Sequence, residues 1–121
     1  MSTHLIGGFL GRIVAGTVSV EGPAGARVLQ VRMGPFFRAD VPLDRVAGVA
    51  VATPPRLAGV GVHGWKGSWV VNGRLGPAAV VDIDPPVRAR VCSVPVKAHR
   101  LALGVTRPAA LVADLDAERA P

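Results

Sequence analysis

Apolar and polar residues alternate over most of the chain, in short runs that glycine and proline separate. Leu29, Val31 and Met33, for example, alternate with Gln30 and Arg32. A period of two places the apolar side chains on one face, which is typical of a half-buried strand. Runs of this kind predict about seven short strands. They cover residues 17–21, 27–33, 37–41, 46–52, 69–71, 79–84, 87–91 and 96–105.

Residues that favour tight turns lie between several of these runs. Asn72-Gly73 is the strongest hairpin signal, because both residues tolerate the positive φ that a type I′ turn requires. It predicts a hairpin whose arms are 69–71 and 79–84. Pro85-Pro86 predicts a bend after the second arm, and Pro95 predicts a turn before the last apolar run.

The period of the apolar residues changes near the C-terminus. Thr106 is a suitable helix cap, and Leu111, Val112 and Leu115 then fall on one side of a helix. This pattern predicts a short helix over 107–117. A helix of this length needs tertiary packing to persist, so we expect its apolar side to lie on the strands.

The order of elements predicts a mostly β protein that ends in one α-helix. Such a sheet must close or stack to bury its apolar face. We therefore expect a small curved β-barrel or an orthogonal pair of sheets, with the C-terminal helix plugging an open end. A chain of 121 residues fits one domain, which we place at 17–121, after a lead-in of uncertain structure at 1–16.

The charge of the chain is strongly basic, with 14 Lys and Arg against 8 Asp and Glu. Three of the acids lie close to the C-terminus, so the rest of the chain is more basic than the whole. A basic body favours anionic lipids, nucleic acid or acidic protein partners. An arginine-rich surface that only keeps the protein soluble is the alternative. Nucleic acid is disfavoured, because the chain has no tyrosine and does not interleave aromatic with basic residues.

Cysteine and histidine are too sparse for a metal site or a disulfide. The chain has one cysteine and three histidines, spaced far apart, so we expect no metal, no cofactor and no internal disulfide. No standard secretory signal is visible, and the apolar stretch 4–20 is interrupted by glycines and Arg12. We expect a cytoplasmic protein, with peripheral association to the membrane as an option.

Two groups of residues are candidates for binding. His63, Trp65 and Lys66 lie in a glycine-rich stretch and could form a binding lip, although Trp65 could equally cover a barrel edge and Trp69 belongs to the core. The second group could form one positive patch on neighbouring strands, or a solvated face that pairs with Asp82 and Asp84. It consists of Arg88, Arg90, Lys97 and Arg100, with His99 beside them.

No catalytic constellation stands out. Cys92 falls in an apolar run, where a cysteine is more often a small buried residue than a nucleophile. His63 and His99 have no partner that can be identified locally, so catalytic residues stay unassigned.

Several segments carry a resemblance to a known family. They resemble segments of small actinobacterial proteins, and the order of strands and helix resembles the pleckstrin-homology-like (PH-like) fold. This resemblance spans about residues 17–115 and implies binding, often of lipid headgroups or peptides. The segments are 37–42 (FRADVP), 61–67 (GVHGWKG), 69–73 (WVVNG), 84–91 (DPPVRARV) and 95–97 (PVK), followed by Leu101, Leu111 and Leu115.

Three functions follow from these patterns. The first is a noncatalytic binding module that engages a protein partner or an anionic membrane surface. The second is a small β-barrel enzyme or binding protein for a hydrophobic metabolite, such as a cyclase acting by positioning, which requires a deep internal cavity. The third is a structural subunit that dimerises through a sheet edge or the apolar residues 5–14.

Overall fold

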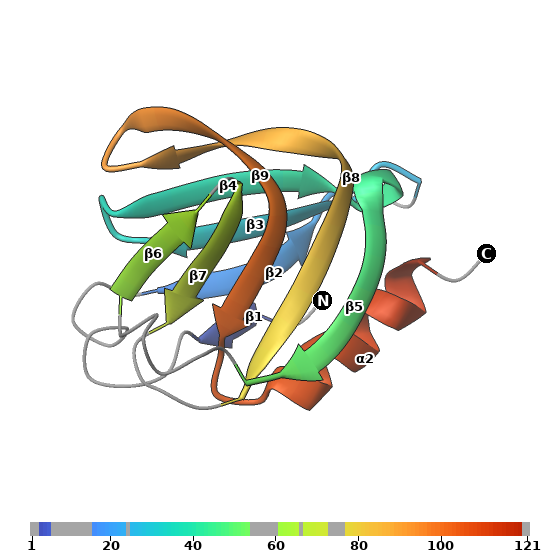
Figure 1. Cartoon of the computed structure of the whole chain (residues 1–121). Helices are drawn as coiled ribbons and strands as arrows, with labels where there is room; N and C mark the ends of the chain where they lie inside the picture. Colours follow the sequence, from blue (N-terminus) through green and yellow to red (C-terminus); the bar gives the residue numbers. More distant parts are fainter. Residues whose placement is uncertain are drawn as a thin grey trace.

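Over the residues that the structure describes, the chain folds into a curled β-sheet that is followed by a C-terminal helix (Figure 1). The computed structural model describes residues 3–5, 16–23, 25–53, 61–65, 67–72 and 77–119. Its elements are β1 (Thr3–Leu5), β2 (Thr17–Glu21), β3 (Val28–Met33), β4 (Phe37–Pro42), the 3₁₀ turn η1 (Leu43–Arg45), β5 (Val46–Ala52), β6 (Gly61–Trp65), β7 (Ser68–Asn72), β8 (Ala78–Val91), β9 (Val94–Gly104) and α2 (Pro108–Arg119). The expected class, a mostly β curled sheet with a C-terminal helix, is confirmed.

The sheet curls because its two longest strands change partners along their length. The strand order is β1-β2-β3-β4-β8-β9-β7-β6, and β5 also pairs with β8. The first half of β8 pairs with β5 and its second half pairs with β4. The register of β8 against β9 shifts between Asp82 and Val87, where Pro85-Pro86 cannot donate to the ladder. The expected bend is therefore inside one continuous strand, and not a break between two strands.

Two of the predicted turns are wrong. The chain reverses at Cys92-Ser93, which have φ of 49° and 71°, whereas Pro95 pairs with Arg90 inside the ladder. The Asn72-Gly73 hairpin with arms β7 and β8 is also not formed: β7 pairs with β6 and runs parallel to β9. Gly73 itself lies outside the described residues. β7 buries its apolar face by pairing with β6 and β9, and this pairing overrides the local turn signal.

The inner face of the curl holds one continuous hydrophobic cluster. Leu29, Val31 and Met33 are all fully buried in it, as their alternation predicted. The same holds for the inward residues of the other strands, including Phe37, Ala39, Val41, Ala79, Val81, Ile83, Val87, Ala89, Ala98, Leu101, Leu103 and Val105. Side chains from both halves of the sheet thus fill the interior.

Helix α2 closes the open side of the curl. Leu111 and Leu115 are fully buried in the cluster, which confirms the predicted helix at slightly different bounds. The helix packs against β5, β8 and η1. On its other side, Asp114 lies 2.7 Å from His4 Nε2 of β1, which itself pairs with β2. No helix among the described residues is long and apolar enough to cross a membrane.

Candidate functional site

Four cations gather on the outer face of the sheet, where β4, β8 and β9 run side by side. Arg38 of β4 lies directly opposite Arg90 of β8, and Arg88 of β8 lies directly opposite Lys97 of β9. Arg88 and Arg90 share a face, because residues two apart on a strand point the same way. All four side chains are exposed, while their neighbours Ala39, Ala89 and Ala98 point into the core. We call Arg38, Arg88, Arg90 and Lys97 the basic patch.

No carboxylate among the described residues forms an ion pair with the basic patch. Asp40, two residues from Arg38 on the same face of β4, is held by Arg32 at 2.7 Å. Within the patch, Arg90 donates only to the backbone carbonyl of Ser93, at 3.2 Å. Like charges that face each other across a sheet destabilise it. Repulsion between the facing cations therefore lowers the stability of the fold, and a bound anion would relieve this repulsion.

A small groove lies at the end of the basic patch, between two hairpin turns. The β3–β4 turn and the β8–β9 turn touch, because the backbone N–H of Cys92 donates to the carbonyl of Phe36 at 3.0 Å. The groove between them has a volume of about 220 Å³ and is lined by Gly34, Pro35, Phe37, Arg38, Arg90 and Ser93. Two arginines that face each other thus line a space at the surface; we call it the tip groove.

Arg100, which the sequence grouped with Arg88, Arg90 and Lys97, is held in an ion pair. Its guanidinium lies 2.7 Å from the carboxylate of Asp82, its cross-strand neighbour. The register shift in β8 places this pair on the other half of the curl, away from Arg88 and Arg90. Arg100 is thus paired as the solvated-face alternative expects, whereas the described residues show no ion pair for Arg88, Arg90 or Lys97. Arg38 was missed, because its position opposite Arg90 depends on a strand pairing that is distant in sequence.

The other predicted group falls at the edge of the described sheet, where β6 is separated from β9 by β7, and its side chains lie outside the described part of the chain. His63 and Trp65 belong to β6, which pairs with β7, and Lys66 is not among the described residues. The turn that follows docks on β9, since the carbonyl of Gly67 accepts the N–H of His99 at 2.8 Å. Only Gly67, which follows the predicted lip, is thus seen to contact β9, and the described residues do not place the lip's side chains on the patch.

Trp69 anchors the same turn region to the sheet. It is half-buried, its ring centroid lies 6.5 Å from that of Phe37, and its Nε1 donates to the carbonyl of Lys97 at 3.0 Å. This residue therefore packs against the core and supports the backbone on which Lys97 is mounted.

Cys92 is exposed, and the expectation of a buried cysteine is wrong. The apolar run that contained it is in fact a tight turn, whose residues point outward. Among the described residues, no group of three or more His, Cys, Asp or Glu could hold a metal ion.

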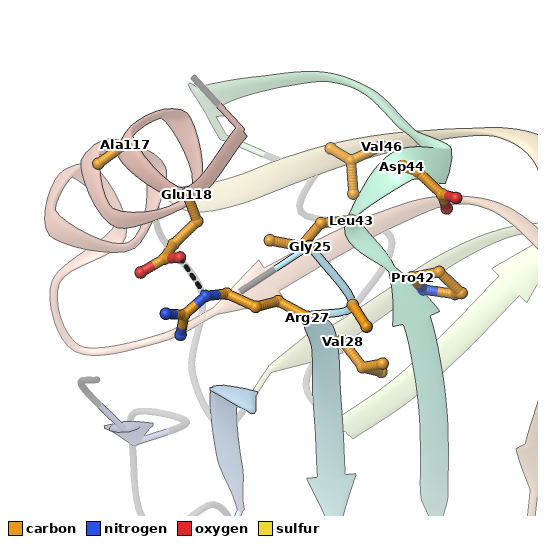
Figure 2. Close-up of a pocket in the computed structure, with 10 residues that line it drawn as sticks. Gly25, Arg27, Val28, Pro42, Leu43, Asp44, Val46, Ala117 and Glu118 are labelled. Atoms are coloured by element: carbon orange, nitrogen blue, oxygen red, sulfur yellow. Dashed lines mark ion pairs between the residues drawn. The ribbon is translucent and has the colours of Figure 1, made fainter. Parts of the chain in front are cut away.

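A wider groove lies at the opposite end of the sheet, between the β2–β3 turn, η1 and the end of α2 (Figure 2). Its volume is about 850 Å³. Arg27 and Glu118 face each other across it at 2.7 Å and neutralise each other, as the dashed line in Figure 2 shows. Exposed residues such as Gly25 and Asp44 form its walls, so it is an open surface groove and not the interior of a barrel.

Comparison of the chain with protein-family models, with curated proteins and with solved structures finds no match. The basic patch is therefore interpreted from its own geometry.

Proposed function

We propose that this protein is a noncatalytic binding module that docks through the basic patch onto an anionic surface. The observation that carries the proposal is the placement of Arg38 opposite Arg90 and of Arg88 opposite Lys97, without any carboxylate paired to them among the described residues. A solvated face with no function would gain stability from any acid at one of these positions. Retaining four cations there is the pattern of a surface that neutralises an external anion.

The resemblance to PH-like domains agrees with a binding role, but it points to another place. The loop after the first long strand, where lipid-binding members of that family carry basic residues, is Gly22-Pro23-Ala24-Gly25 and holds no cation. The cations of this chain are on the outer face of β4, β8 and β9 instead. The proposed site is accordingly the sheet surface and not that loop.

The continuous buried cluster inside the sheet favours binding over the alternative of a barrel enzyme. An internal site for a hydrophobic metabolite needs an apolar cavity of several hundred Å³. Here the inward side chains of the strands and of α2 belong to one buried cluster. Both grooves described above have exposed residues in their walls and open at the surface.

The binding energy expected from the patch is moderate. Each Lys or Arg close to an anionic membrane surface contributes about 1 kcal/mol, which is about a fivefold gain in affinity. Removing two of the four cations should therefore weaken docking by about thirtyfold. The loss should shrink at high ionic strength, because exposed charges are screened.

The test compares two double variants with the same net charge. Arg38→Gln with Arg90→Gln removes half of the patch, whereas Arg45→Gln with Arg107→Gln removes two exposed arginines that have no ion pair among the described residues. Binding is measured by sedimentation with phosphatidylcholine vesicles, with and without phosphatidylserine, and on immobilised polyglutamate. We expect the patch variant to lose binding to an anionic surface and the control variant to keep it. Equal losses in both variants on both surfaces would show that only net charge matters and would overturn the proposal.

A further inference from the structure

Two exposed apolar side chains stand at the turns next to the basic patch. Phe36 in the β3–β4 turn is 41% exposed, and Val94 after the β8–β9 turn is 59% exposed. Their turns are joined by the Cys92–Phe36 backbone hydrogen bond of 3.0 Å. Phe36 and Val94 thus lie at the same end of the sheet. We call the β3–β4 turn with Phe36 and the β8–β9 turn with Val94 the two tips.

Both tips are held in place by backbone hydrogen bonds. The N–H of Phe36 donates to the carbonyl of Met33 at 2.9 Å, and Cys92-Ser93 form a two-residue turn with positive φ at both positions. Such turns match the twist of the flanking strands. Side chains mounted on an ordered turn lose little conformational freedom when they bind.

The cations lie within two residues of the apolar side chains, along the strand or across the ladder. Arg38 follows Phe36 by two residues, and Arg90 pairs with Pro95, the neighbour of Val94. A strand advances about 3.3 Å per residue, so the charged groups are set back from the tips by one or two such steps. In an anionic bilayer the headgroup layer overlies hydrocarbon, and amphipathic elements bury their apolar face about 5–10 Å deep. A set-back of one or two steps, about 3–7 Å, overlaps the lower part of this depth.

We propose that the two tips insert into an anionic lipid bilayer, with Phe36 and Val94 at the acyl boundary and Arg38 and Arg90 binding a lipid phosphate in the tip groove. The inference rests on the proposed docking function and names its partner. An acidic protein surface would satisfy the cations, but it offers no hydrocarbon layer beneath the charge for both tips together. The bilayer is therefore the occupant that uses all four residues.

The single cysteine of the chain allows a direct test. Cys92 is exposed in the β8–β9 turn, where its N–H contacts the β3–β4 turn, so its thiol can be labelled with an environment-sensitive fluorophore. On vesicles that contain phosphatidylserine we expect a blue-shifted, brighter emission, which lipids carrying a quencher in the acyl chain reduce. A label on Ala109→Cys in a Cys92→Ser background reports on exposed helix α2 and should not shift.

Matched variants without a label separate insertion from the label's own affinity for lipid. Phe36→Ser with Val94→Ser should bind these vesicles about tenfold more weakly than the wild type, because burial of each apolar side chain adds to binding. Leu5→Ser with Val51→Ser is the control, since these side chains are 57% and 45% exposed and lie away from the tips. The control should bind as the wild type does.

The outcomes distinguish this inference from the docking proposal. Sedimentation with anionic vesicles, without a shift at Cys92 and without loss in the tip variant, would overturn insertion and leave docking intact. Binding to polyglutamate but not to anionic vesicles would overturn the bilayer in favour of an acidic protein. Binding to neither would overturn the docking proposal itself.

Discussion

Reversing one charge of the basic patch should make the fold more stable while it weakens binding. The variant is Arg38→Glu, which replaces a like-charged pair with Arg90 by an opposite-charged pair. Arg38 also faces Arg32, but Arg32 is paired with Asp40 at 2.7 Å, so these two charges nearly cancel. The change in free energy of unfolding therefore comes mainly from Arg90.

The magnitude follows from the geometry of a cross-strand pair. Two unit charges about 6 Å apart in water interact by about 0.7 kcal/mol, and physiological salt reduces this by about half. Removing a repulsion and adding an attraction of this size gives about 0.5–1 kcal/mol of stabilisation, within the range measured for cross-strand pairs. With a urea dependence of about 2 kcal/mol per M, the unfolding midpoint should rise by about 0.3–0.5 M.

Urea titration monitored by tryptophan fluorescence measures this shift, and Arg38→Gln provides the matched variant. Glutamine has the shape of glutamate without its charge, so it should give about half the gain. In 1 M NaCl, where the Debye length is about 3 Å, the glutamate and glutamine variants should have the same urea midpoint. A glutamate variant less stable than the glutamine variant at low salt would refute the electrostatic reasoning.

Two further predictions concern the fold that carries the patch. Leu115→Ala should lower the free energy of unfolding by about 3 kcal/mol, because the side chain is fully buried. Ala113→Ser, on the exposed side of α2, should lower it by well under 1 kcal/mol. Similar denaturation midpoints for the two variants would show that the helix does not close the curled sheet. Gly67→Ala should lower the melting temperature more than Gly25→Ala does. Both glycines have φ near +85°, but only at Gly67 would the new Cβ lie 2.7 Å from His99 Cδ2. Thermal melts that coincide for the two variants would contradict the close packing of this turn on β9.

Local patterns in the sequence predicted the parts of the fold that depend on local physics. The alternation at Leu29, Val31 and Met33 identified their buried face, because a strand that buries one face shows this period wherever it pairs. The change of period at Thr106 identified α2 for the same reason, and Leu111 and Leu115 are buried as expected.

Pairings between distant segments were not predictable from these patterns. Asn72-Gly73 is a strong turn signal, yet β7 pairs with β6 and β9, since burial of the sheet decides which strands become neighbours. For the same reason the sequence pattern did not identify Arg38 opposite Arg90 or the pairing of Arg100 with Asp82, because residues close in sequence need not be neighbours across a bent strand. Cys92 looked buried because a turn between two apolar strands has the composition of a strand.

The most direct test of the account is amide hydrogen exchange of the full chain in the presence of vesicles that contain phosphatidylserine. We expect slower exchange at residues 34–38 and 90–97, and unchanged exchange in α2 and at residues 25–28 beside the wide groove. Phosphatidylcholine vesicles should change neither region. Protection of α2 or of residues 25–28, with the tips unprotected, would show that the protein docks through another face and would contradict the role assigned to the basic patch.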